Sequence, residues 1–164
     1  MKLYIQQKIF SWFDSFNVFD ENGNKVYNIK GKLSWGKCVK IYDMQDNEIG
    51  MVKEKIISIT PTYNISYQNK NIGNIHRKMF KLIGPGYAID YLGWKIDGNI
   101  LEWNYTIKDK HGNLVAKVTK EHIHLTDTYC MNIVNPEDAI FVVMFAVAID
   151  AEKASRKDKK ANND

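Results

Sequence analysis

Few residues of this chain have types and spacings that could support catalysis. The sequence contains no Gly-x-Ser-x-Gly nucleophile turn, no phosphate-binding Gly-Lys-Ser/Thr loop, no Gly-x-Gly-x-x-Gly motif and no His-Glu-x-x-His zinc motif. Gly84-Pro85-Gly86 and Gly112 have too little around them to cradle a phosphate and are predicted to be turns. We therefore expect no enzymatic activity, no catalytic residue and no cofactor.

His122 and His124 form a pair with the spacing of metal ligands. They stand two residues apart on an expected strand, so both project from the same face. A structural zinc site needs four ligands, and a catalytic site needs three from the protein. Asp127 or His76 could complete such a set only through a fold that the sequence does not reveal. We interpret the two histidines as residues of a sheet wall beside a turn and predict no metal site.

Three groups of basic residues, which lie in successive hairpins, could attract anionic groups. A barrel could bring the groups to one rim, where they would bind lipid head groups. Outward lysines also keep sheets soluble, and Glu54 interrupts one of the groups, so a merely solvated face is the second interpretation. The candidates are Lys30, Lys32 and Lys37, then Lys53 and Lys55, then Arg77, Lys78 and Lys81 with His76 beside them.

The four tryptophans could form a membrane-docking rim or a platform on which bases stack. Trp12 and Trp35 occupy equivalent positions in a repeat, which indicates a shared role in core packing. For Trp94 and Trp103 the sequence leaves the choice open.

The composition is that of an ordinary globular domain. The 164 residues are 45% hydrophobic and 26% charged, and the formal net charge of +4 is too mild for a dedicated nucleic-acid binder. The N-terminal stretch lacks the apolar run of a signal peptide. Cys38 and Cys130 are too few for a disulfide framework and favour a reducing compartment. We expect a cytoplasmic protein, with the inner face of the membrane as a peripheral location.

Two kinds of turn alternate along the first two-thirds of the chain. One kind reads Asp20-Glu21-Asn22-Gly23-Asn24, Asp43-Met44-Gln45-Asp46-Asn47 and Asp109-Lys110-His111-Gly112-Asn113, with Asp97-Gly98-Asn99 and Gln68-Asn69-Lys70-Asn71 as variants. Asp and Asn bond their own backbone, and Gly or Asn tolerates positive φ, so these are predicted hairpin tips. The second kind follows segments such as Lys32-Leu33-Ser34-Trp35 and Lys55-Ile56-Ile57-Ser58-Ile59 at a spacing near 23 residues.

Two turns in each period mean two strands in each period, and therefore a series of β-hairpins. The segments between turns are rich in β-branched and aromatic residues, and several alternate. A long sheet of sequential hairpins most simply closes on itself. The sequence thus predicts a mainly β fold, a closed antiparallel barrel of about twelve strands over residues 3–134.

The C-terminal part predicts a helix that fills this barrel. Asn135 suits an N-cap, Pro136 suits the first helical position, and residues 139–149 contain no polar side chain. A helix apolar on every side is buried or spans a membrane, and eleven residues rise only about 16 Å, too short for a span. The expected core residues are Ile140, Phe141, Val142, Val143, Met144, Phe145, Val147 and Ile149. We expect one domain over 1–155, with the helix over about 136–153, and a polar, disordered tail over 156–164.

These landmarks resemble the LURP-one-related family, whose members share the tubby-like barrel. The matching stretches are QQKIFSW at 6–12, DENG at 20–23, IYDMQDNEIGMVKEKIIS at 41–58, PTYNI at 61–65 and TDTYCMNIV at 126–134. The likeness is closest to small bacterial members that consist of this domain alone. It implies a twelve-stranded barrel around a hydrophobic C-terminal helix and assigns no activity. Tubby proteins and phospholipid scramblases share the fold and act at membranes, an analogy of fold only.

Three functional hypotheses follow. The first is a non-enzymatic binding or scaffold domain that acts at anionic phospholipid surfaces, and its alternative is a soluble protein-interaction domain. A carrier of a small hydrophobic ligand is disfavoured, because the apolar helix occupies the space that such a ligand would need.

Overall fold

The computed structural model describes the chain except residues 7–14, 33, 78–86, 101, 124–125 and 162–164. Side chains are also left undescribed at residues 6, 77, 88, 122–123, 126–127 and 154–161.

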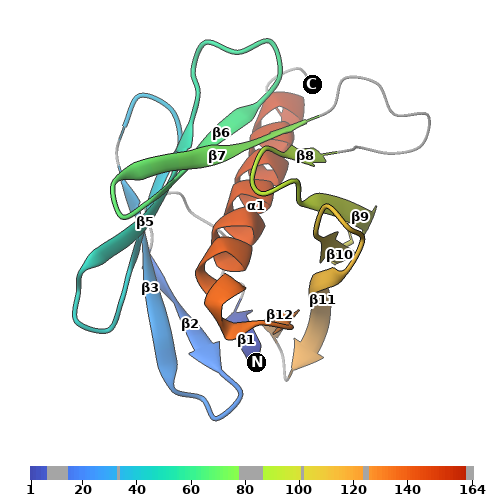
Figure 1. Cartoon of the computed structure of the whole chain (residues 1–164). Helices are drawn as coiled ribbons and strands as arrows, with labels where there is room; N and C mark the ends of the chain where they lie inside the picture. Colours follow the sequence, from blue (N-terminus) through green and yellow to red (C-terminus); the bar gives the residue numbers. More distant parts are fainter. Residues whose placement is uncertain (7–14, 33, 78–86, 101, 124–125, 162–164) are drawn as a thin grey trace.

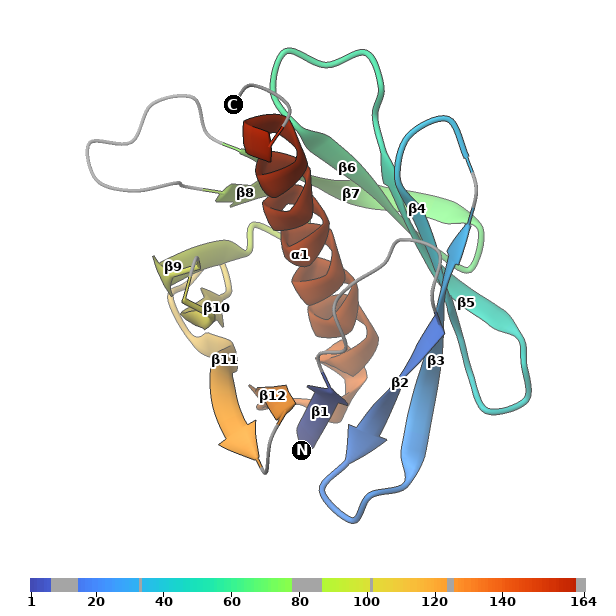
Figure 2. The same cartoon turned by 180° about the vertical axis from the view of Figure 1, so that it is seen from behind.

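Antiparallel strands make up most of the described chain. Their bounds are β1 Lys2–Gln6, β2 Ser15–Asp20, β3 Lys25–Lys32, β4 Cys38–Tyr42, β5 Glu48–Glu54, β6 Thr62–Tyr67, β7 Lys70–Arg77, β8 Tyr87–Ile89, β9 Lys95–Asn99, β10 Asn104–Lys108, β11 Leu114–Ile123 and β12 Thr126–Ile133. A short 3₁₀ helix, η1 (Pro136–Asp138), leads into α1 (Ala139–Ala161). Figures 1 and 2 show α1 lying between β2–β7 on one side and β9–β12 on the other.

Neighbouring strands pair in the order β1-β12-β11-β10-β9-β8-β7-β6-β5-β4-β3-β2, and β1 also pairs with β2. The thinnest junction is between β8 and β9, which share the single registered pair Ala88↔Lys95. The prediction of a mainly β, antiparallel sheet with one C-terminal helix is confirmed. Full closure of the wall depends on that one pair and remains a proposal.

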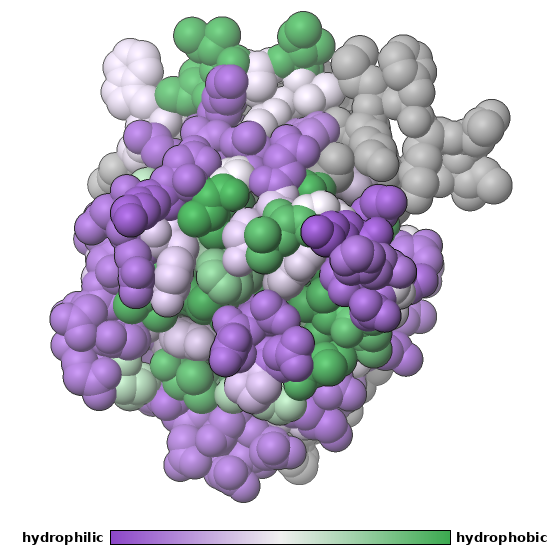
Figure 3. Space-filling view, viewed as in Figure 1, coloured by the Kyte–Doolittle hydropathy of each residue, from purple (hydrophilic) through white to green (hydrophobic). Residues whose placement is uncertain are grey.

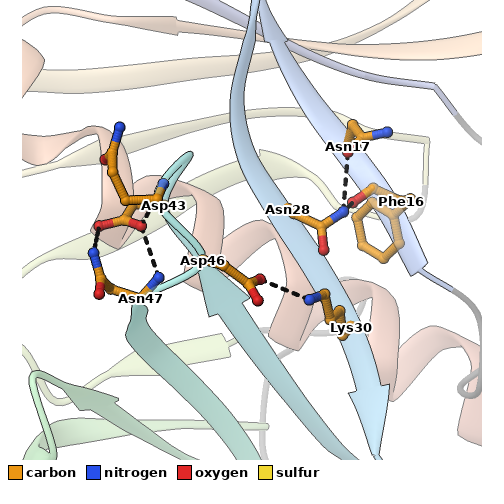
Figure 4. A network of polar contacts seen from close by, with 8 residues as sticks. Phe16, Asn17, Asn28, Lys30, Asp43, Asp46 and Asn47 are labelled. Carbon is orange, nitrogen blue, oxygen red and sulfur yellow. Dashed lines mark hydrogen bonds and ion pairs between the residues drawn. The ribbon is translucent and has the colours of Figure 1, made fainter.

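The Asp-initiated turns form as predicted, and three of them share one hydrogen-bond pattern. Asp43 Oδ1 accepts from the backbone amides of Gln45 and Asn47 at 2.9 and 2.8 Å, and Asp43 Oδ2 accepts from Asn47 Nδ2 at 2.9 Å (Figure 4). Asp20 and Asp109 make the same three contacts. These bonds to the charged form lower the pKa of all three carboxyl groups. Each aspartate therefore sets the register of its hairpin locally.

The predicted turn at Asp97-Gly98-Asn99 is wrong. These residues belong to β9, where Asn99 pairs with Asn104 and Gly98 with Tyr105, and the chain reverses after them. Gly98 has φ of +116°, and a Cβ there would lie 2.7 Å from the Asn104 carbonyl oxygen. The glycine thus permits close approach of two strands instead of making a turn.

The helix is enclosed by the sheet over its first half. Val142, Val143, Met144, Phe145 and Ile149 are completely buried, and Ile140 and Val147 are nearly so. Phe141 is half-buried and lies against the rings of Tyr67 and Tyr91 at centroid distances of 5.1 and 4.9 Å.

The predicted ends of the helix need two corrections. Asn135 stands at the N-cap position with an extended backbone, but its side chain makes no capping hydrogen bond. The helix also continues to Ala161 instead of ending near 153, so residues 156–161 are helical and not part of a disordered tail. The segment after Ile149 is rich in Ala and Lys and has no Gly or Pro to stop the helix, and cations near a helix C-terminus are stabilising.

We expect Phe145→Ala to destabilise the fold by about 3–5 kcal/mol, because it opens a cavity beside the buried ring of Trp94. Phe141→Ala, which removes the same atoms from a half-buried position, is the matched control and should cost clearly less. Urea unfolding followed by circular dichroism measures both. Equal losses for the two variants would contradict an enclosed helix.

Candidate functional site

Two neighbouring loops and the strand ends that carry them form the candidate site. We call residues 34–37, between β3 and β4, and residues 55–61, between β5 and β6, the rim loops. Glu54 N donates to Lys37 O at 2.7 Å, and Lys37 N donates to Glu54 Oε2 at 3.0 Å. A Cβ on Gly36 would lie only 3.2 Å from Ile56 Cγ1, so the two loops are in contact.

Lys37 joins the rim loops to the helix. Its Nζ donates to the Ala151 carbonyl oxygen at 3.2 Å, and Ala151 is completely buried. This predicted lipid contact therefore has a structural role: the Lys37 stem lies inward, and its ammonium group meets a helix carbonyl from the second half of α1.

Two lysines of β3 and β4 form ion pairs with carboxylates. Lys30 Nζ lies 2.8 Å from Asp46 Oδ1 (Figure 4) and 4.3 Å from the ring centroid of Tyr42. Lys40 Nζ lies 2.6 Å from Glu48 Oε2. The hydrogen bond to the acid raises the pKa of each lysine. Lys30, a predicted lipid contact, thus has its charge directed at the β4–β5 turn.

Lys32 and Lys53 come together on the outer face near the rim loops. Lys32 pairs with Cys38 across β3 and β4, and Lys53 pairs with the same Cys38 across β4 and β5. Burial raises the pKa of the Cys38 thiol, while the charges of Lys53, Lys40 and Lys32 act in the opposite direction. Lys32, Lys53 and the adjacent Lys55 are exposed, and none of the three makes an ion pair within the described part of the chain.

The third predicted basic group is only partly visible. Arg77 ends β7, but its side chain is not described, and Lys78 and Lys81 lie outside the described residues. His76 Nδ1 lies 3.5 Å from Asp90 Oδ2. This group stays a prediction.

The tryptophans divide differently from what the repeat suggests. Trp35 is 87% exposed, so its predicted core role is wrong. It stands in a bend before Gly36, whose φ of +82° turns the chain between β3 and β4. Trp94 and Trp103 are buried, and Trp103 stacks on Tyr129 at a centroid distance of 3.8 Å. Trp12 lies outside the described residues.

The exposed isoleucines of the second rim loop were missed by sequence reasoning. The stretch Lys55-Ile56-Ile57-Ser58-Ile59 resembles a strand in composition, but it bends, and Ile57 and Ile59 are 89% and 93% exposed. The available signal was the lack of strict alternation, together with Pro61 directly after the segment.

The metal hypothesis gains no support. His122 lies on β11 in register with Asp127, but its side chain is not described, and His124 lies outside the described residues. Among the described residues, no group of three or more His, Cys, Asp or Glu side chains could hold a metal ion. Cys38 and Cys130 are both free and buried.

Several polar side chains are buried beside the second half of α1. Glu152 and Asp150 are buried, and Tyr87 Oη donates to Glu152 Oε2. Tyr105 is buried nearby, its pKa is raised by burial, and its hydroxyl has no hydrogen-bond partner among the described residues. Lys153 covers the ring of Trp103 at 4.6 Å and reaches the Ile100 carbonyl. These contacts join the second half of α1 to β8 and to Ile100 and Trp103 between β9 and β10.

In the part of the chain that the structure describes, α1 and η1 are too short or too polar to cross a bilayer.

Comparisons with known proteins agree with this architecture. The LURP-one-related family model matches residues 1–150. The protein YxjI of Bacillus subtilis (strain 168), described as uncharacterised, is 25% identical over 151 residues, which are 92% of this chain and 92% of YxjI. The X-ray structure of an Arabidopsis thaliana protein superimposes with a TM-score of 0.57 at 12% identity, covers 91% of each chain and shows the fold alone.

The family match covers nearly the whole sequence, and the resemblance based on the turns and the C-terminal helix is confirmed. The chain belongs to the LURP-one-related family.

Proposed function

We propose that this domain is a non-enzymatic module that binds anionic phospholipid at a membrane surface, with the rim loops facing the bilayer. The observation that carries the proposal is that three exposed lysines without an ion pair among the described residues are grouped beside the rim loops. Lys30, Lys40 and Lys108 each have a carboxylate within 3.2 Å, whereas Lys32, Lys53 and Lys55 have none among the described residues. Positive charge is thus left uncompensated beside the rim loops.

Uncompensated lysines suit an anionic bilayer for a physical reason. A lysine near such a surface gains about 1 kcal/mol from the surface potential, and a lysine already paired with a carboxylate gains less. Three exposed ammonium groups on adjacent strand ends can act together on one plane. A location at the inner face of the membrane belongs to this proposal.

The alternatives fit the same observations less well. A small-ligand carrier needs interior space, and Val142, Val143 and Met144 are completely buried where a ligand would sit. A soluble protein-interaction domain needs a contact face of about 800 Å² per partner, and the exposed hydrophobic residues of the rim loops make a smaller surface than that.

We also propose that the wall is a closed barrel. Support comes from β1, which pairs with both β2 and β12, and from the pair Ala88↔Lys95 that joins β8 to β9. Closure predicts that amide hydrogens of β9 exchange as slowly as those of its partner β10. Hydrogen exchange with mass spectrometry measures both segments. Rapid exchange confined to β8 and β9 would mean that the sheet is open there.

The triple variant Lys32→Gln/Lys53→Gln/Lys55→Gln should bind anionic vesicles about 100-fold more weakly than the unaltered protein, because three surface-potential contributions are lost. Co-sedimentation with phosphatidylserine-containing and pure phosphatidylcholine vesicles, at two salt concentrations, measures this. Binding should fall with salt, since the Debye length shortens.

Lys25→Gln/Lys70→Gln/Lys110→Gln is the matched control. It removes the same charge from exposed hairpin lysines away from the rim loops, and it should bind almost normally. Equal losses of binding in both triple variants would mean that binding depends on the overall charge and not on a local site. No binding of the unaltered protein to either kind of vesicle would refute the proposed function.

A further inference from the structure

The most exposed large hydrophobic side chains of the described chain all lie in the rim loops. Trp35, Ile57 and Ile59 are 87–93% exposed, and Ile56 in the same loop is 58% exposed. Elsewhere the largest value is 67%, at Leu92. Scattered apolar residues are ordinary on a surface, but a cluster of the most exposed ones marks a site of interaction.

These four side chains stand on two loops that are in contact, and we call them the apolar tip. Its two loops touch where Gly36 meets Ile56, and the backbone of Lys37 pairs with that of Glu54. Figure 3 shows hydrophobic residues projecting at the top of the molecule, where Figure 1 places the loop between β5 and β6, close to the C-terminal end of α1.

The loops that carry the apolar tip are held in place from below. The Ser58 hydroxyl lies 2.7 Å from the Thr60 carbonyl oxygen and 3.1 Å from that of Lys55. Lys55 N donates to Thr62 O at 2.8 Å, and Lys37 ties the other loop to α1. Polar groups of the loops thus bond the protein itself, and the isoleucines on either side of Ser58 are presented to solvent. A preorganised tip loses little entropy on insertion.

We propose that the apolar tip inserts into the interfacial region of an anionic bilayer, with Lys32, Lys53 and Lys55 at the level of the head groups. This inference rests on the proposed function and adds how the domain is held and oriented. Aliphatic side chains would enter the acyl boundary, and the Trp35 indole would lie at the interface that tryptophan prefers. The apolar and the electrostatic contributions then act together, as stable peripheral binding requires.

A bilayer fits the apolar tip better than a second copy of the chain. Four side chains fall short of the roughly 800 Å² per partner that a stable protein interface buries. A two-fold contact through the tip would also bring the unpaired lysines of both copies together, and each copy carries a net charge of +4. An anionic lipid surface complements both the apolar centre and its basic surroundings.

The test uses Trp35 as its own probe. In a Trp12→Phe background, vesicles containing phosphatidylserine and brominated lipid should quench part of the tryptophan fluorescence, and adding Trp35→Phe should remove most of that quenching, because Trp94 and Trp103 are buried. The variant Ile57→Asn/Ile59→Asn should bind the same vesicles at least tenfold more weakly. Both isoleucines are nearly fully exposed, so thermal unfolding should be unchanged.

Met44→Asn/Leu92→Asn is the control, since it removes two exposed hydrophobic residues outside the apolar tip and should leave binding intact. Salt-sensitive binding without quenching of Trp35, or with normal binding by the isoleucine variant, would overturn the insertion and leave the proposed function standing. Failure of the unaltered protein to bind any vesicle would overturn both. Concentration-dependent dimers that the isoleucine changes abolish would assign the tip to a second copy instead.

Discussion

The structure depends on one constraint: residues 139–149 form a helix with no polar side, and every side must be kept from water. Two layers cannot do this, because a sheet covers only one face of a helix. The series of hairpins curves around α1 and so covers its several sides. Strands β3–β6 and β10–β12 all contribute buried residues, such as Ile41, Ile65 and Met131. The helix in turn supplies the core of a sheet that would otherwise surround empty space.

In the proposed function, this arrangement leaves binding to the outside of the molecule. The interior is filled by α1 and by enclosed groups such as Tyr87 and Glu152, so the wall offers ligands its outer face and its loops. The lysines on that outer face differ in whether a carboxylate lies beside them. Lys30 and Lys40 have acidic partners, whereas Lys32 and Lys53 stand on either side of buried Cys38 without one among the described residues. Charge and exposed apolar area consequently coincide at the rim loops.

Locally determined features could be predicted from the sequence, and features set by tertiary neighbours could not. An aspartate that bonds amides two and four residues ahead, as Asp20 does, needs no distant partner, so the turns and the register they impose were readable. Trp35 was misjudged because repeat equivalence suggested packing, while Gly36 turns the chain outward. The bond between Lys30 and Asp46 joins two hairpins, and nothing in either segment alone reveals it.

The most direct test of the account is hydrogen exchange of the intact protein with and without phosphatidylserine-containing vesicles. In the free protein the amides of α1 over 140–151 should be among the slowest, because the sheet encloses them. Vesicles should add protection at residues 34–37 and 55–61 and leave the hairpin turns at 20–24, 43–47 and 109–113 unchanged. Protection concentrated at those turns, or rapid exchange along the helix in the free protein, would contradict the account.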